Sequence, residues 1–189
     1  MTRRQTQRHD KMHLPRIWLM TDPRLGDDLL PAIKKLPTGS GVIFRHYALT
    51  DTARRRLFGQ VRRLCHRRGH MILLAGDERS ALRWHADGFH LRSRKRRRSS
   101  RMILSAPVHN RRELAQAVRI GADLVLLSPV FTTASHPGAK ILGRTAFMAL
   151  AGQCKDIAVI ALGGMTARKA AMFDKRRIHG WAAIDAFKL

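Results

Sequence analysis

The chain has 189 residues, with 37 Lys and Arg against 13 Asp and Glu, which gives a formal net charge of +24. This length supports one domain with its own hydrophobic core, so no disulfide framework or structural metal is needed to stabilise it. Neither the basic segment 1–15 nor any other segment is apolar enough for a signal peptide or a membrane span, and we expect a soluble cytoplasmic protein.

Short apolar segments alternate with segments of helical periodicity, a pattern that favours parallel β-strands connected by helices. Thr50 or Asp51 is the expected N-cap of a long helix, whose arginines, Arg54 among them, are expected mostly on its solvent face. The highly charged segment 92–101 is predicted to be an exposed, mobile connection. The first half of the chain is predicted to contain strands at 16–20, 41–45, 71–75 and 88–91 and helices at 27–35, 50–68 and 78–85.

The same alternation continues through the second half of the chain. A loop rich in Ser, Thr, Pro and Gly is expected at 128–143, and long loops inside a regular α/β array are usually functional. Cys65 and Cys154 lie far apart in the sequence, and we interpret both as buried thiols of a reducing compartment. The predicted elements are strands at 102–106, 123–127, 158–162 and 181–184 and helices at 110–120, 145–153 and 166–174.

The succession of eight strands predicts an α/β fold, a single compact (β/α)8 TIM barrel whose last helix is truncated. The barrel is expected to occupy residues 16–189, after a basic arm at 1–15. A doubly wound open sheet is the alternative architecture. In a TIM barrel, functional side chains lie where strands end and the following connections begin.

Two segments at such strand ends point to phosphate binding. Gly163 and Gly164 follow an apolar strand and precede Thr166 at a helix start, and glycines let backbone N–H groups approach an oxyanion closely. The alternative is a tight turn that needs glycine for backbone reasons only. The segment 128–138 offers hydroxyls and the His136 imidazole, which could hold phosphate oxygens or position a leaving group, or could form a plain polar loop. Its hydroxyls include those of Thr132, Thr133 and Ser135.

The segments 86–91, 121–133, 160–165 and 180–186 resemble the thiamine phosphate synthase and TenI family in order and spacing. The resemblance extends over roughly residues 16–187. Thiamine phosphate synthases join a hydroxymethylpyrimidine pyrophosphate to a thiazole phosphate, and they use magnesium to hold the departing pyrophosphate. The resemblance therefore implies a transferase of thiamine biosynthesis that binds these phosphorylated compounds and their product, thiamine phosphate.

The resemblance also assigns roles to individual residues. Gly163 and Gly164 would bind the thiazole phosphate through backbone amides, and Thr133 and Ser135 would contact the pyrophosphate. Three positions are implied to be catalytic. They are Ser105 near the reacting pyrimidine, Arg45 in what remains of a Gln-x-Arg-x-Lys motif, and His136 in place of a lysine.

Several positions differ from the family pattern. The two positions at which the family has magnesium-binding carboxylates are occupied here by Gly76 and Lys95, and Asp77 lies one position after the first of them. No metal site is therefore predicted, even though the resemblance implies magnesium as a cofactor. Asp185 replaces a serine beside the thiazole phosphate. Pro129 replaces the catalytic histidine of the TenI branch, which argues against thiazole tautomerisation.

Two hypotheses follow. In the first, the chain is a transferase whose arginines replace magnesium, because fixed guanidinium groups stabilise a departing phosphate. In the second, it is a non-catalytic barrel that binds a phosphorylated metabolite, or a basic protein that associates non-specifically with nucleic acid. An arginine-rich composition of solvated faces explains the charge equally simply. The sequence leaves the oligomeric state open. The arginines that would replace magnesium in the first hypothesis are Arg45, Arg92, Arg94 and Arg96.

Overall fold

The structure, a computed structural model, describes residues 14–91, 102–133, 138 and 141–187. The predicted connection at 92–101 lies outside these ranges, as do Ser135, His136 and the basic arm up to residue 13. The expected roles of these segments therefore stay predictions.

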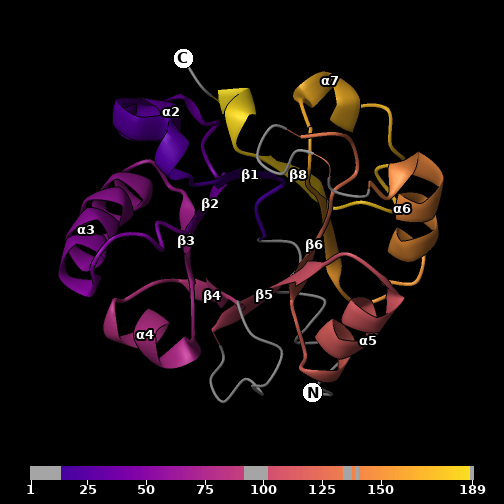
Figure 1. Ribbon diagram of the computed structural model, residues 1–189, viewed down its shortest axis with the longest axis horizontal. Helices are drawn as coiled ribbons and strands as arrows, with labels where there is room; N and C mark the ends of the chain where they lie inside the picture. The colour runs from indigo at the N-terminus through magenta and orange to yellow at the C-terminus, as the bar shows by residue number, and fades with distance from the viewer. Residues whose placement is uncertain (1–13, 92–101, 134–137, 139–140, 188–189) are drawn as a thin grey trace.

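Eight parallel strands close into a barrel in sequence order, from β1 next to β2 round to β8 next to β1. Figure 1 shows the strands as an inner ring with the helices around it. The predicted TIM barrel is confirmed, and the open sheet is wrong. The strands are β1 Ile17–Met20, β2 Gly41–Phe44, β3 Met71–Ala75, β4 Gly88–His90, β5 Ile103–Val108, β6 Leu124–Leu127, β7 Ala158–Ala161 and β8 Gly180–Ala183.

Helices connect most of the strands, and polar side chains begin several of them. The side chains of Thr50, Asp77, Asn110 and Thr166 each accept a hydrogen bond from the N–H three residues later, which satisfies a helix donor that has no backbone partner. The helical elements are η1 Pro23–Asp28, α2 Leu29–Lys35, α3 Asp51–Arg67, α4 Glu78–Arg83, α5 Arg111–Arg119, α6 Gly143–Ala151, α7 Ala167–Ala170 and η2 Asp185–Phe187.

The helices differ from prediction by two residues or more at four places, one of which is α4, which ends two residues before the end of the predicted helix at 78–85. The helix expected at 27–35 begins as the 3-10 segment η1, and the one expected at 145–153 starts and ends two residues earlier. The helix expected at 166–174 is reduced to the four residues of α7. The chain turns after α7, which brings Phe173 inward against Phe131 and Phe147. The last helix is truncated to η2, as predicted.

Side chains fill the barrel at the amino-terminal ends of its strands. Trp18 of β1 is fully buried inside the ring, and its Nε1 donates to the Pro15 carbonyl at 2.7 Å. A Cβ at the neighbouring Gly41 would collide with the Trp18 ring, so glycine is required there. Leu14 packs into the same interior cluster. The barrel is therefore plugged at this end, and an open site has room only at the carboxyl ends of the strands.

Neither cysteine forms a disulfide, and only one of the two is buried as predicted. Burial, with the nearby Asp87 carboxylate, raises the pKa of the Cys65 thiol to about 12. Cys154 follows α6 and is half-buried, with its thiol donating to the Leu150 carbonyl at 3.5 Å, so the prediction that it is buried is wrong. None of the helices in the described ranges has the length and apolarity of a transmembrane segment. The cytoplasmic location stays a prediction.

Candidate functional site

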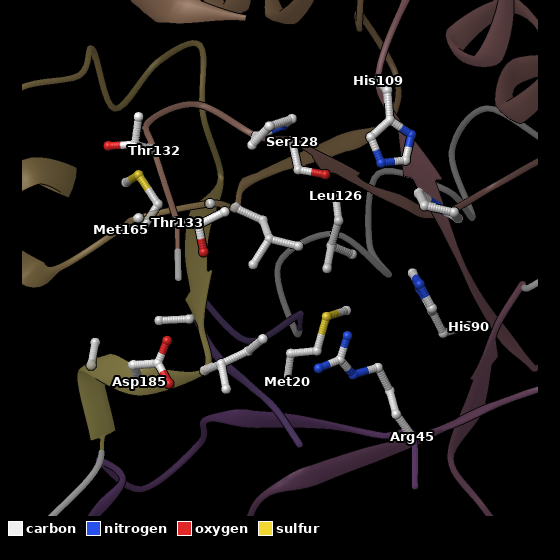
Figure 2. Close-up of a pocket in the computed structure, with 18 of the residues that line it drawn as sticks. Met20, Arg45, His90, His109, Leu126, Ser128, Thr132, Thr133, Met165 and Asp185 are labelled. Atoms are coloured by element: carbon white, nitrogen blue, oxygen red, sulfur yellow. The ribbon is translucent and has the colours of Figure 1, made fainter. Parts of the chain in front are cut away.

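A cavity of about 420 Å³ lies at the carboxyl ends of the strands. It brings together four residues predicted from the sequence, namely Arg45, Thr133, Gly163 and Gly164. In Figure 2, Thr132, Thr133, Met165 and Asp185 lie on one side of the cavity, and Arg45, His90 and His109 lie on the other. Met20, Leu91, Pro107, Leu126 and Leu162 contribute apolar wall.

The Gly163–Gly164 turn after β7 offers backbone donors to this cavity. Both glycines have positive φ, +98° and +59°, which non-glycine residues rarely adopt. Within the described part of the chain, the N–H groups of Gly163, Gly164 and Met165 donate to no protein acceptor. Because free N–H groups in a cavity wall bind oxyanions well, the turn is a candidate phosphate site.

The loop after β6 packs directly on the glycine turn. Val130 N–H donates to the Leu162 carbonyl at 2.9 Å, and Phe131 N–H donates to the Gly163 carbonyl at 3.1 Å. A Cβ at Gly163 would lie 2.7 Å from the Cα of Pro129. Residues 128–133 of the first predicted phosphate segment and the glycine turn therefore form one structural unit, and glycine is needed both for the turn and for this packing.

Lys169 adds positive charge to the turn and was not predicted from the sequence. Its Nζ donates to the Gly164 carbonyl at 2.7 Å and lies 4.7 Å from the centre of the Phe131 ring. The ammonium group therefore holds the turn in place and favours an anion nearby. The only sequence signal is its position one turn into the helix that Thr166 caps.

Arg45 lies at the end of β2 and projects a guanidinium toward the cavity. Its Nε donates to the Thr21 carbonyl at 2.7 Å, and its Nη2 pairs with the Asp22 carboxylate at 2.6 Å. Burial lowers the pKa of Arg45, and the attraction of Asp22 opposes that shift, so the side chain stays charged. Burial alone would raise the pKa of Asp22, but hydrogen bonds from Arg24 and the charge of Arg45 lower it overall.

Arg24 extends this pair into a chain of four charges. Its Nε lies 2.8 Å from Asp22 Oδ1, and its Nη1 lies 3.4 Å from Asp185 Oδ1. These contacts form a chain that connects the ends of β2, β1 and β8, in the order Arg45, Asp22, Arg24, Asp185. Both terminal members line the cavity, so one contributes a positive charge and the other a negative charge to it.

Ser105 acts on the cavity through His90. The two residues face each other across β4 and β5, and His90 Nδ1 lies 2.8 Å from Ser105 Oγ. Ser105 is fully buried, whereas His90 lines the cavity. Burial, with repulsion from Arg45, lowers the pKa of His90 to about 4, so the imidazole is neutral at pH 7.

Acidification should destabilise the fold through His90. An unfolded histidine takes up a proton below about pH 6.5. The folded one resists protonation down to about pH 4. Between these two pH values the unfolded state binds more protons than the folded state. The free energy of unfolding therefore decreases as the pH is lowered, by up to about 3 kcal/mol. Urea unfolding at pH 7, 5.5 and 4.5 measures the loss. His90→Gln should lose less stability across this range, and an equal loss in both proteins would contradict a buried neutral His90.

The family profile described as thiamine monophosphate synthase matches residues 18–187. The chain belongs to the thiamine phosphate synthase and TenI family. It is 30% identical over 185 residues to the putative thiamine-phosphate synthase 2 of Aquifex aeolicus, covering 93% of this chain and 99% of that protein. It is 26% identical over 181 residues to the thiamine-phosphate synthase of Bacillus velezensis, covering 89% and 81% respectively.

Solved structures show the same fold. The thiamine phosphate pyrophosphorylase of Pyrococcus furiosus superposes with a TM-score of 0.77 at 22% identity, over 93% of this chain and 88% of that one. A 2-keto-3-deoxy-6-phosphogluconate aldolase of Zymomonas mobilis gives a TM-score of 0.61 at 12% identity, over 92% and 83%. The barrel of this thiamine phosphate synthase family member is thus shared with enzymes named for different reactions.

Magnesium, which family membership implies, does not fit the residues present. The end of β3 carries Ala75 and Gly76, which have no side-chain oxygen, and Asp77 caps α4 by accepting from Ser80 N–H at 2.8 Å. The described residues contain no group of three or more His, Cys, Asp or Glu side chains that could hold a metal ion. The nearby carboxylates of Asp22 and Asp185 are paired with arginines.

The guanidinium of Arg54, a residue of α3, lies at the ends of β2 and β3. The prediction that Arg54 lies on the solvent face of its helix is therefore wrong. Its Nε donates to the Arg45 carbonyl at 2.8 Å, and its Nη2 donates to the Ala75 carbonyl at 2.6 Å. Three aromatic rings surround the guanidinium at 5.3 to 5.9 Å from their centres, and these contacts hold it in place. The rings belong to Phe44, Tyr47 and Trp84.

Proposed function

We propose that this thiamine phosphate synthase family member binds the phosphorylated thiazole and pyrimidine compounds of thiamine biosynthesis in its cavity. The thiazole phosphate would lie on the Gly163–Gly164 turn. The observation that carries the proposal is the set of N–H groups there that find no acceptor among the described residues, reinforced by the ammonium group of Lys169. The cavity volume of about 420 Å³ is also within the range of small-molecule sites.

In the proposed reaction, the thiazole nitrogen displaces pyrophosphate from the pyrimidine compound. Arg45 would neutralise the departing pyrophosphate in place of a metal, because its guanidinium is fixed by Thr21 and Asp22 before any ligand arrives. Ser105 would orient His90 beside the pyrimidine. Thr133 lines the same cavity and remains the proposed pyrophosphate contact. The other loop groups proposed from the sequence are Ser135 and His136.

The transferase proposal predicts turnover that does not depend on magnesium. Purified protein is mixed with the pyrimidine pyrophosphate and the thiazole phosphate, and thiamine phosphate is measured by mass spectrometry with magnesium or with EDTA. We expect product in both samples at rates within about twofold, because no carboxylate set holds the metal. A rate lost in EDTA would contradict metal-free neutralisation. No product from folded protein in either sample would refute the transferase.

A barrel that binds the same compounds without turnover is the second candidate. It is favoured by the missing carboxylates at the end of β3 and by Asp185 in the cavity wall. Binding to the native state raises its melting temperature, so thermal stabilisation by thiamine phosphate without any turnover would identify this function.

The basic outer surface favours association with nucleic acid as a further property. Six arginines of α3 and α4 are exposed and form no ion pair with the described residues. Such a face attracts the phosphate backbone without reading sequence. RNA affinity that falls steeply with added salt, with no thermal stabilisation by thiamine phosphate, would favour this role over the small-molecule site. The arginines are Arg55, Arg56, Arg63, Arg67, Arg79 and Arg83.

A further inference from the structure

Asp185 places a negative charge in the wall of the proposed phosphate site. It begins η2 directly after β8 and lines the same cavity as Gly163 and Gly164. Figure 2 shows it on the same side as Thr133 and across from Arg45. Its side chain is 43% exposed. A carboxylate in this position acts on whatever ligand occupies the turn.

Arg24 only partly neutralises this carboxylate. The Arg24–Asp185 contact is 3.4 Å long, whereas the same guanidinium contacts Asp22 at 2.8 Å. Asp185 forms no other ion pair with the described residues. The chain of four charges thus leaves Arg45 at one end and Asp185 at the other, both facing the cavity. The site is bipolar, with amide donors and a carboxylate in one wall.

A bipolar site discriminates between phosphate esters by the charge on the rest of the molecule. Asp185 opposes the phosphate of any ester, since like charges repel. A positive charge elsewhere in the ligand reverses this effect by pairing with the carboxylate. A ligand that carries both charges is bound more tightly by the amide donors and by the carboxylate. A purely anionic ester is attracted by the amide donors only.

We infer that Asp185 selects a phosphate ester with a fixed positive charge on its ring over the corresponding ester with an uncharged ring. The inference rests on the proposed function, which places the phosphate on the glycine turn. Of the compounds in the proposed reaction, the thiazole phosphate has an uncharged ring. When its nitrogen bonds to the pyrimidine methylene, the ring of thiamine phosphate becomes permanently positive. Asp185 therefore favours the product over the precursor.

Calorimetric titration of both compounds into three proteins tests the inference. The proteins are the wild type, Asp185→Asn, and Asp156→Asn, which removes the same charge from an exposed position that does not line the cavity. We expect Asp185→Asn to bind thiamine phosphate more weakly and thiazole phosphate more tightly, changing the affinity ratio about fivefold to tenfold at low salt. Asp156→Asn should leave the ratio unchanged, and added salt should reduce the effect of Asp185→Asn.

The outcomes separate the inference from the proposed function. If both compounds bind the wild type and the ratio is the same in Asp185→Asn, the selection is refuted while the phosphate site stands. If neither compound binds the folded wild type, the proposed function and the inference both fail. Asp185→Ser provides a second variant of different shape, and it should change the ratio in the same direction. Melting temperatures confirm that each variant is folded.

Discussion

Gly164→Ala should abolish phosphate binding in the cavity and lower the free energy of unfolding by about 3 kcal/mol. Gly164 has a φ of +59°, and a Cβ there would collide with the carbonyl oxygen of Thr132. The loop after β6 must then move off the turn, which displaces the N–H groups of Gly163 and Gly164. Calorimetry with thiamine phosphate measures the binding, and urea unfolding measures the stability.

Gly121→Ala is the matched control for this variant. Gly121 also has a positive φ, +73°, but nothing lies within 4 Å of the Cβ that alanine would add. Gly121→Ala should therefore lower the free energy of unfolding by the backbone strain alone, about 1 kcal/mol, and leave the cavity unchanged. If Gly164→Ala is no more destabilising than Gly121→Ala, or if it binds thiamine phosphate as the wild type does, the loop after β6 does not pack tightly on the turn.

Arg45→Met should weaken the binding of inorganic pyrophosphate about 30-fold and lower the free energy of unfolding by about 2 kcal/mol. The guanidinium supplies a charge to the cavity, and its loss leaves the Asp22 carboxylate with Arg24 alone. The side chains of Arg45 and Asp22 are 17% and 16% exposed, so water replaces the lost contact poorly. Calorimetry and urea unfolding again provide the two measurements.

The double variant Asp22→Asn, Arg45→Met separates the two effects. Removing the Asp22 carboxylate, which in Arg45→Met keeps only Arg24, should recover at least half of the lost stability, because the cost comes from a largely buried charge that has lost one of its two partners. Pyrophosphate binding should stay weak, since the positive charge is still absent. Wild-type pyrophosphate affinity in Arg45→Met would contradict the role given to Arg45 in neutralising the leaving group.

The barrel was predictable because each strand is a short apolar segment bounded by polar or glycine residues. Local signals also located the glycine turn and the cap at Thr50, since these depend on a few neighbouring residues. The helix at 166–174 was overestimated because the burial of Phe173 against two other rings overrides helical periodicity. Periodicity cannot register contacts with residues as distant in the sequence as Phe131 and Phe147.

The site was predicted less completely than the barrel, because several of its features depend on contacts between distant segments. Arg54 has the sequence context of an exposed helical arginine, and only the fold brings it to carbonyls of β2 and β3. The sequence likewise gives no sign that Arg24 joins Asp22 to Asp185, or that Ser105 reaches the cavity only through His90. Such roles require the closed barrel, which places the ends of all eight strands at one mouth.

The amide signals of Gly163 and Gly164 provide the most direct test of phosphate binding at the turn. Protein labelled with 15N-glycine is titrated with thiamine phosphate and followed by two-dimensional NMR. We expect the signals of these two glycines to shift to lower field and saturate together, while Gly39 and Gly121, which do not line the cavity, stay in place. Unchanged Gly163 and Gly164 signals at saturating ligand, or equal shifts at all four glycines, would contradict an anion site at this turn.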